Sequence, residues 1–368
     1  MPPPSSSAPH AGDSAPRRRR PRYSGKYPRR FEDKYKEHQP DRFGDTVAIV
    51  LASGKTPAGT HRPIMVSETL DALRPRPGEI FVDGTLGYGG HALAILPKLV
   101  PGGKLIGIDA DPIELQKTES RLREQAWSED LAVIRRSNFA GLPQVLAALG
   151  IEAVDGLLVD LGVSSMQLDN PARGFSAKFD GPLDMRMNPA RGYPASALLA
   201  KSSPASLQLL LESHADEPHA ALLASELAGR NFSSTMALAD AIRTVHVRVS
   251  KADQDASIRR VFQALRIEVN DEFSALETLL RFLPGLLRPG GRAAILTFHS
   301  GEDRRVKKAF LAGKSGGWFD DIAPEPVRPS TEERRDNPRS TSAKLRWARR
   351  STRLPEDPVV SVPHPSLK

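Results

Sequence analysis

Glycines between two carboxylates form the segment of this sequence best suited to bind a ligand. Residues 80–83 are an apolar run that ends in Asp83, and three glycines follow within residues 87–90. Because glycine has no Cβ, such a turn can approach a nucleotide closely. A second apolar run ends in Asp109, about 20 residues downstream, where a carboxylate can accept hydrogen bonds from both hydroxyls of a ribose. The spacing therefore predicts an adenosine-containing ligand at the carboxyl ends of parallel strands.

The order of residues around the glycines indicates which adenosine ligand this is. A dinucleotide fingerprint has the spacing Gly-x-Gly-x-x-Gly and places a helix N-terminus against a pyrophosphate. Here Asp83 precedes the glycines, and its carboxylate would repel a pyrophosphate but suits a ligand with an amine and a sulfonium. S-adenosylmethionine carries both groups. Two alternatives are a nicotinamide-dependent dehydrogenase, which the glycine spacing disfavours, and a strand–helix turn without a ligand, which Asp109 disfavours.

A third acidic residue, Asp160, lies at the end of the apolar run of residues 154–161. In a doubly wound sheet this end of a strand faces the reactive part of the ligand, so Asp160 and Gln167 are placed to contact the methionine part or the substrate. The alternative is a structural turn in which Ser164 and Ser165 cap backbone N–H groups. This segment alone does not decide between the two interpretations.

Two other polar segments have both a functional and a structural interpretation. Asp184 and Arg186 alternate with apolar residues, and they could clamp a nucleotide or form a structural ion pair. His299 follows another apolar run, but no second metal ligand stands at a suitable spacing. We therefore expect a structural histidine at this position and no metal site.

The composition of the 368-residue chain limits the function classes. Cysteine is absent, which excludes disulfides, thiolate zinc sites and cysteine nucleophiles, and no apolar run approaches the roughly 18 residues of a membrane span. Residues 1–60 hold 12 Lys and Arg against 6 Asp and Glu, so most of the net charge of +8 comes from this segment. With few aliphatic residues it is expected to be disordered. Its arginines and tyrosines predict an RNA-contacting arm, with a solubilising tail or a mitochondrial transit peptide as alternatives.

Strand-like and helix-like runs alternate along the chain, which predicts a parallel sheet covered by helices on both faces. Strands are expected at residues 80–83, 105–109, 131–134, 154–161, 293–298 and 345–348. Helices are expected at residues 64–73, 92–99, 198–211, 220–230, 237–245 and 258–287, and a charged loop at 314–340. No strong strand pattern occurs between about 167 and 254, so this stretch is expected to be an inserted helical subdomain.

Taken together, the motifs resemble those of the ribosomal small-subunit RNA cytosine-N4 methyltransferases of the MraW type. They stand in the family's order and cover residues 61 to about 350. The first of them are His61-x-Pro63-Ile64-Met65, Asp83-Gly84-Thr85-x-Gly87-x-Gly89-Gly90-His91, Ile108-Asp109-x-Asp111-Pro112 and Asp155-Gly156-Leu157-Leu158-Val159-Asp160-Leu161-Gly162-Val163-Ser164-Ser165. The others are Arg173-Gly174-Phe175-Ser176, Gly181-Pro182-Leu183-Asp184-Met185-Arg186-Met187, Phe262-Gln263-Ala264-Leu265-Arg266-Ile267-x-Val269-Asn270, Pro289-Gly290-Gly291-Arg292, Phe298-His299-Ser300 and Asn337-Pro338-Arg339-Ser340.

The resemblance implies an α/β fold of class I S-adenosylmethionine-dependent methyltransferases, which is a Rossmann-like sheet, with an inserted helical subdomain. The expected bounds are a disordered basic arm at 1–60, a methyltransferase domain at 61–168 and 255–353, a helical substrate-recognition insert at 169–254 and a flexible tail at 354–368. The implied reaction is N4-methylation of a cytidine in the decoding region of small-subunit ribosomal RNA. The partner is then this RNA or the assembling small subunit in the bacterial cytoplasm, with the mitochondrial matrix as an alternative location.

The resemblance also implies roles for individual residues. Positions that match cofactor contacts of the family are Gly89, Gly90, His91, Asp109, Phe139, Asp160 and Gln167. Asp160 is in addition the candidate catalytic residue, and the hypothesis for substrate contacts comprises Asp184, Arg186 and Arg260. The chain departs from the family pattern at Met166, Gly301, residues 256–259 and Thr341, which alters the RNA-facing rim more than the cofactor pocket. Alternatives are therefore a different RNA substrate, or a ribosome assembly factor that has lost the activity.

Overall fold

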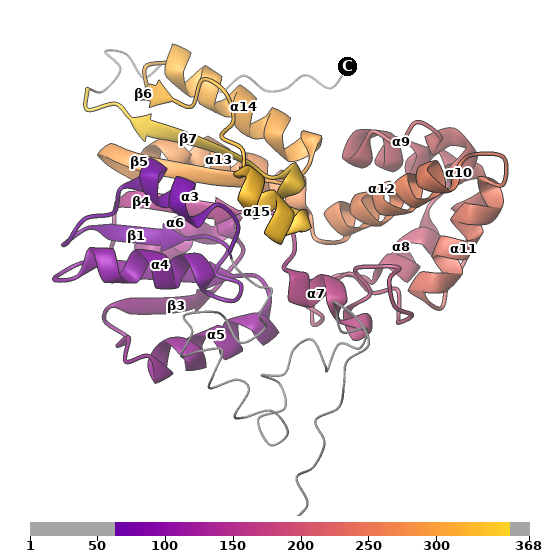
Figure 1. Ribbon diagram of the computed structural model, residues 1–368, viewed down its shortest axis with the longest axis horizontal. Coiled ribbons are helices and arrows are strands. Elements are labelled where there is room, and N and C mark those ends of the chain that lie inside the picture. Colours follow the sequence, from indigo (N-terminus) through magenta and orange to yellow (C-terminus); the bar gives the residue numbers. More distant parts are fainter. Residues whose placement is uncertain (1–62, 354–368) are drawn as a thin grey trace, which may run out of the picture. The chain divides into compact units, whose positions relative to one another are not determined.

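The computed structural model describes residues 63–353, which form a seven-stranded sheet with helices on both faces and a group of helices beside it (Figure 1). The strands lie in the order β3-β2-β1-β4-β5-β7-β6. Their bounds are Ile80–Asp83 (β1), Lys104–Asp109 (β2), Ala132–Arg136 (β3), Val154–Asp160 (β4), Leu287–Thr297 (β5), Phe319–Ile322 (β6) and Lys344–Arg350 (β7). The chain reverses direction across the sheet between β1 and β4, where sheets of this type bind their ligands. The predicted arm and tail lie outside the described residues.

The strands β1 to β6 all run in one direction, and β7 alone runs opposite to them. Val82 of β1 pairs in parallel with Ile106 of β2 and with Leu157 of β4. By contrast, β7 runs antiparallel to both β5 and β6. The chain passes from β5 through a helix to β6 at the edge and then returns as β7 between them. The predicted parallel sheet is therefore correct for β1 to β5 and wrong for the strand predicted at 345–348, which is β7, because this return depends on pairing with β5 and has no local sequence signal.

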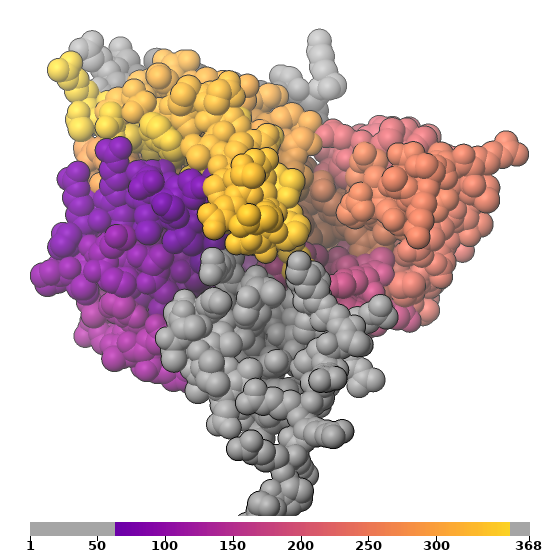
Figure 2. Space-filling view, in the orientation of Figure 1, coloured from indigo at the N-terminus to yellow at the C-terminus, as the bar shows by residue number. Residues whose placement is uncertain are grey.

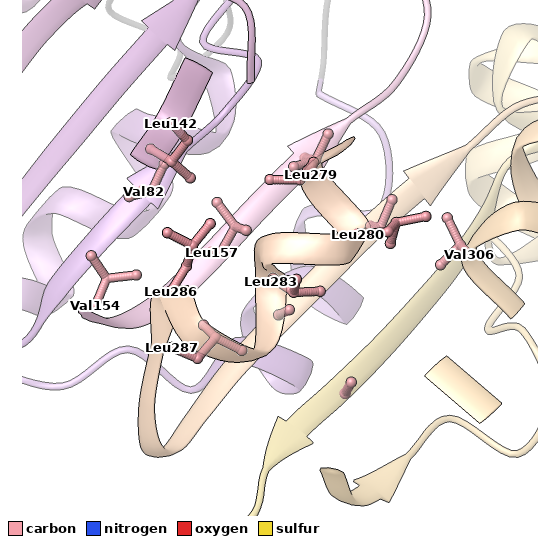
Figure 3. Close-up of a cluster of buried hydrophobic side chains, with 14 of the residues drawn as sticks. Val82, Leu142, Val154, Leu157, Leu279, Leu280, Leu283, Leu286, Leu287 and Val306 are labelled. Atoms are coloured by element: carbon pink, nitrogen blue, oxygen red, sulfur yellow. The ribbon is translucent and has the colours of Figure 1, made fainter. Parts of the chain in front are cut away.

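Successive residues of the central strands point to opposite faces, so each face has its own apolar core. Val82 and Leu157 pack against α6 (Leu142–Ala148), α13 (Glu272–Leu286) and α14 (Ser300–Ser315) on one face. Figure 3 shows leucines 279, 280, 283 and 286 of α13 lying along this face. Phe81 and Leu158 pack on the other face against α3 (Val66–Leu73), α4 (Gly90–Leu99) and α5 (Pro112–Glu124). Both faces are thus covered, as predicted.

A third core lies within the group of helices that follows β4. The helices around it are α8 (Ala195–Lys201), α9 (Pro204–Ala215), α10 (Ala220–Leu227), α11 (Thr235–Val245) and α12 (Lys251–Val269). Ile258 and Leu265 of α12 belong to the same core, and the bounds 169–254 for an insert stay a prediction. Among residues 63–353, no helix is both long enough and apolar enough to cross a lipid bilayer.

Two of the predicted helices are in fact pairs of helices. Residues 198–211 fall in α8 and α9, because Pro204 can begin a helix but cannot continue one, and Ser203 caps the new N-terminus. Residues 258–287 fall in α12 and α13, because Asp271 adopts a left-handed conformation with φ 52°. The predicted loop at 314–340 contains β6 and α15 (Thr331–Asp336), and α14 has no counterpart among the predicted helices. These elements are short or highly charged, so their periodic signal is weak.

Candidate active site

A cavity of about 610 Å³ lies at the carboxyl ends of β1, β2 and β4. Six of the seven residues predicted to contact the cofactor line it, namely Gly90, His91, Asp109, Phe139, Asp160 and Gln167. Gly89 is not among the lining residues. The tertiary structure thus brings together side chains from four separate segments of the chain. Their contacts with the cofactor stay a prediction.

The glycine turn is held tightly between α5 and the start of the described chain. Gly89 has φ 78°, and a Cβ on it would lie 2.7 Å from Cγ2 of Thr118 in α5. A Cβ on Gly90 would lie 2.7 Å from Cγ of Pro63. Gly89 is therefore required for packing behind the turn, whereas Gly90 begins α4 and borders the cavity.

Asp109 ends β2 with both carboxylate oxygens already in use by the backbone. Its Oδ2 accepts a 2.7 Å hydrogen bond from the Gly87 N–H, and its Oδ1 accepts a 2.8 Å bond from the Asp111 N–H. Each oxygen keeps a second lone pair for a ligand hydroxyl. Burial raises the pKa of the Asp109 carboxyl to about 7, although these two N–H donors lower it. A neutral hydrogen-bond donor such as a ribose hydroxyl would therefore stabilise the buried carboxylate of Asp109.

Asp83 does not take the role that its position suggested. It is buried, it is not among the residues that line the cavity, and its Oδ1 accepts a 3.1 Å hydrogen bond from the Thr85 N–H. Thr85 in turn accepts a 2.6 Å hydrogen bond at Oγ1 from the Asp160 N–H. Burial raises the pKa of Asp83 to about 6, against the opposing effect of His91. Asp83 thus forms part of a structural link between β1 and β4, and its suitability for a ligand with an amine and a sulfonium stays a prediction.

Asp160 and His91 face one another across the cavity wall. Nε2 of His91 lies 3.7 Å from Oδ2 of Asp160, whose side chain is 28% exposed. Within the described part of the chain, Oδ1 of Asp160 is buried and has no hydrogen-bond partner. A buried carboxylate oxygen without a hydrogen bond indicates that a ligand supplies the donor. The amino group of S-adenosylmethionine has this chemistry, so the residues present fit that cofactor.

Gln167 is held by bonds within the protein. Its Oε1 accepts a 2.8 Å hydrogen bond from the Ser164 N–H, and its Nε2 donates a 2.8 Å bond to Oδ2 of Asp111. Arg173 lies 2.8 Å from the same Asp111 oxygen. The alternative reading of this turn, in which serines cap it, is therefore correct in part, because Ser164 caps α7 (Ser165–Asp169). Asp111 and Arg173 were not predicted as site residues, although both stand in the motifs quoted above.

Phe139 supplies an aromatic ring beyond the end of β3. It begins the short 3₁₀ helix η2 (Phe139–Gly141), which Asn138 caps by accepting a 3.0 Å hydrogen bond from the Ala140 N–H. Both residues line the cavity on the side of β2 away from β4. A half-exposed aromatic face in this place suits stacking with an adenine ring.

Comparison with known proteins agrees with this geometry. The sequence model that describes the MraW methylase family matches residues 58–351 of this chain. A protein of Agathobacter rectalis named ribosomal RNA small subunit methyltransferase H 1 is 46% identical over 343 residues, covering 91% of this chain and 98% of the relative. A protein of Alkaliphilus metalliredigens named ribosomal RNA small subunit methyltransferase H 2 is 48% identical over 341 residues, covering 90% and 97%.

The chain belongs to the MraW methylase family. The predicted family is thereby confirmed, and with it the class I methyltransferase fold and the dependence on S-adenosylmethionine. A relative from Burkholderia vietnamiensis, named ribosomal RNA small subunit methyltransferase H, is 40% identical over 314 residues and covers 79% of this chain and 98% of its own length.

The cavity of this MraW-family chain continues past Asp160 to a polar end, whose residues were not among the predicted site residues. Arg266 at the end of α12 donates two hydrogen bonds to Glu272 of α13, from Nε to Oε1 at 2.8 Å and from Nη2 to Oε2 at 2.9 Å. Burial alone would lower the pKa of Arg266, but Glu272 and Glu302 raise it. Phe273 and Phe298 line the same end. The motif that contains Arg266 was recognised, but its role was not, because its partner follows a helix break.

His299 makes local contacts at the start of α14, and its structural role stays a prediction. It caps α14, and its Nε2 lies 3.0 Å from Oε1 of Glu302. Burial would raise the pKa of Glu302, but His299 and Arg266 lower it. Within residues 63–353, no group of three His, Asp or Glu side chains is arranged to hold a metal ion.

The residues predicted to contact substrate do not line the cavity. Asp184 and Arg186 pair with each other, with Nη2 to Oδ2 at 2.7 Å, and Arg260 lies 3.6 Å from the buried carboxylate of Glu217. The structural alternative for the first pair is therefore observed, and any substrate contact of these three residues would lie outside the cavity. At Gly301, a Cβ would lie 2.7 Å from Cζ of Phe273, so a larger residue there requires a shift of this ring.

The C-terminal part of the described chain closes one side of the cavity. Arg339 in η4 (Pro338–Ser342) lines it and lies 2.8 Å from Oδ1 of Asp169. In Figure 2 the yellow residues around α15 lie against the indigo residues at the start of the described chain, where Glu333 accepts a 2.8 Å hydrogen bond from the Met65 N–H. Segments more than 260 positions apart in sequence therefore border one cavity.

Proposed function

We propose that this enzyme transfers a methyl group from S-adenosylmethionine to the exocyclic N4 of a cytidine in the decoding region of small-subunit ribosomal RNA. The curated relatives are named ribosomal RNA small subunit methyltransferases, which supports the RNA class. The observation that carries the proposal is the unpartnered Oδ1 of Asp160, which is buried in one cavity that Asp109 and Phe139 line together with Arg266 and Glu272.

The adenosine end would be held by the residues predicted from the sequence. Asp109 accepts hydrogen bonds from the ribose, Phe139 stacks with the adenine, and Gly90 and His91 border the amino-acid part. Gly89 supports the turn from behind, and Gln167 fixes the β4–α7 turn. The bound cofactor supplies an electrophilic methyl group.

The chemistry at the other end concerns the cytosine amine. This amine is a poor nucleophile, because its lone pair is delocalised into the ring. Oxygen acceptors must draw it toward tetrahedral geometry, and alignment with the methyl donor supplies much of the acceleration. Asp160 would either bind the amino group of the cofactor or accept a hydrogen bond from the cytosine amine.

The polar end of the cavity suits a pyrimidine base. Arg266 keeps Nη1 free of the two hydrogen bonds that it makes to Glu272, and the partly buried Phe298 offers an aromatic ring nearby. A guanidinium N–H can donate to the carbonyl oxygen of cytosine, and aromatic rings can stack with the base. We further propose that the helices within 169–254 and the basic arm contact the surrounding RNA of the assembling small subunit in the bacterial cytoplasm.

The test is transfer of tritium from labelled S-adenosylmethionine to small-subunit particles and to free small-subunit RNA, followed by mass spectrometry of the nucleosides. N4-methylcytidine is expected. A methyl group on ring carbon 5 or on ribose would refute the amine chemistry. Cofactor and RNA binding without any transfer would instead support an assembly factor that has lost the activity.

A further inference from the structure

Glu114 presents a buried carboxylate to the cofactor cavity, and the residues discussed so far leave it unused. It lies in the first turn of α5, is 6% exposed and lines the cavity together with Gly87 and Asp109. Its Oε1 accepts a 3.1 Å hydrogen bond from Nζ of Lys117. Its Oε2 is buried and has no hydrogen-bond partner anywhere in residues 63–353.

The packing of α5 directs this part of the helix at the glycine turn. Asp111 caps the helix by accepting hydrogen bonds at Oδ1 from the N–H groups of Ile113 and Glu114, at 3.0 and 3.4 Å. One turn later, Thr118 donates a 2.5 Å hydrogen bond from Oγ1 to the carbonyl oxygen of Gly87. Residues four positions apart lie on the same face of a helix, so Glu114 and Thr118 share the face that meets the turn.

Glu114 is more than nine-tenths buried, and burying its Oε2 without a hydrogen-bond donor costs free energy of folding. This oxygen therefore points to a donor that a ligand supplies. The adenosine part of the cofactor has two kinds of donor, the adenine amine and the ribose hydroxyls. Phe139 and Asn138 border the cavity beyond β3 and suit the base. The hydroxyls are therefore the donors left for the end of β2, where Glu114 and Asp109 lie.

We infer that Glu114 is a second carboxylate for the ribose, accepting one of its two hydroxyls at Oε2 while Asp109 accepts the other. Sharing the two hydroxyls between two carboxylates is reasonable, because each oxygen of Asp109 already accepts a backbone N–H, from Asp111 and from Gly87. The inference rests on the proposed use of an adenosine cofactor. It makes Glu114 a binding residue that also discriminates against ligands lacking a free ribose diol.

The experiment measures the affinity of the full-length protein for S-adenosylhomocysteine and for its 2′-deoxy and 3′-deoxy analogues by calorimetry. Glu114→Gln and Glu114→Ala should weaken binding of the parent compound by about 10- to 100-fold for Ala and less for Gln, which keeps an acceptor oxygen. For one of the two deoxy analogues, the same substitutions should change the affinity by less than about twofold, because the hydroxyl that Glu114 accepts is absent.

Glu119→Gln is the matched control, since it removes a carboxylate from the same helix where it pairs with Arg123 at 3.4 Å and is 45% exposed. It should leave all three affinities unchanged. Glu114→Gln is nearly isosteric, so it keeps the test valid if the alanine variant unfolds.

Three outcomes would overturn the inference. Unchanged affinity for the parent compound would show that Glu114 only pairs with Lys117 and does not contact the ligand. An equal loss for all three compounds would show that it shapes the helix rather than binds a hydroxyl. Failure of the unaltered protein to bind S-adenosylhomocysteine at all would refute the proposed function itself, which separates the two failures.

Discussion

Nε2 of His91 lies 3.7 Å from Oδ2 of Asp160, and this contact joins the glycine turn to the end of β4. Burial alone would lower the pKa of the His91 imidazole, but Asp160, Asp83 and Glu333 raise it above its ordinary value. One oxygen of Asp160 thus faces a ring that readily carries a proton, while the other is left for a ligand. The pair places a charged acceptor where the two ends of the cavity meet.

Asp160→Asn tests this acceptor. The neutral amide keeps an acceptor oxygen and nearly the same shape, but it loses the charge that would attract an ammonium group. We expect weaker cofactor binding and a turnover lower by about 10²- to 10⁴-fold if the residue also receives the proton. Nucleoside mass spectrometry of treated RNA gives the activity, and calorimetry gives the affinity.

Glu152→Gln is the control for Asp160→Asn, because it removes an exposed carboxylate that precedes the same strand. It should behave like the unaltered enzyme. If Asp160→Asn is fully active, the carboxylate only supports the turn after β4.

The raised pKa of Asp109 predicts how cofactor affinity depends on pH. The carboxylate accepts ribose hydroxyls better than the carboxylic acid does, and the pKa of about 7 means that the ligand-free site is largely protonated below that pH. Binding must then release a proton. Affinity for S-adenosylhomocysteine should rise between pH of about 5.5 and 7, by at most about tenfold per pH unit, and level off above pH of about 8.

Asp109→Asn should abolish this pH dependence and weaken binding at pH of about 8 by at least about tenfold. The same calorimetric titrations check both effects. A slope that persists in the variant would assign the titration to another group, such as Asp83.

Gly89→Ala should destabilise the protein without removing a group that lines the cavity. The substitution imposes the left-handed φ of 78° on a residue with a Cβ, and it places that Cβ 2.7 Å from Thr118. Together these effects should lower the free energy of unfolding by about 2–4 kcal/mol, as measured by urea denaturation.

Gly150→Ala separates the two causes. Gly150 also has a positive φ, of 66°, but a Cβ there would meet nothing within 4 Å. Gly150→Ala should lower the free energy of unfolding by only about 1–2 kcal/mol, because only the backbone conformation is unfavourable. Equal losses at both positions would mean that Thr118 moves aside at little cost.

Arg266→Lys should separate substrate binding from cofactor binding. Lysine keeps the positive charge beside Glu272 but cannot reproduce the two-point hydrogen bonding or leave a guanidinium N–H for a base. The kcat/KM for RNA methylation should fall by about 10- to 100-fold, while affinity for S-adenosylhomocysteine stays within about twofold. A parallel loss of cofactor affinity would instead indicate that the ion pair holds the whole cavity in shape.

Deletion of residues 1–57 tests the basic arm. Phosphate contacts position a protein on RNA but do not select a base. The truncated protein should bind RNA more weakly and with a smaller salt dependence, and it should still produce the same modified nucleotide. Filter binding at several salt concentrations measures this, and an unchanged affinity and slope would favour a solubilising or targeting role.

Local sequence and the family resemblance together predicted residues that the fold gathers at one cavity. The glycine turn and Asp109 belong to one strand–turn–helix–strand unit of about 30 residues, and geometry within such a unit follows from spacing. Asp160 was predicted to lie at the same edge because the carboxyl ends of parallel strands meet there, and Phe139 was implied by the family resemblance; both line the cavity. The same reasoning predicted β1 to β5, whose apolar runs are buried on both faces.

What only the tertiary structure decided is which polar groups face the cavity and which face each other. Asp83 has the right spacing for a ligand but turns toward Thr85, and Asp184 pairs with Arg186 away from the cavity. Arg266 and Glu272 come together across a helix break at Asp271 that the periodic pattern does not reveal. The return of β7 between β5 and β6 likewise depends on pairing between strands far apart in sequence. Hydrogen bonds and ion pairs across such distances are set by the packed fold, so spacing along the chain does not encode them.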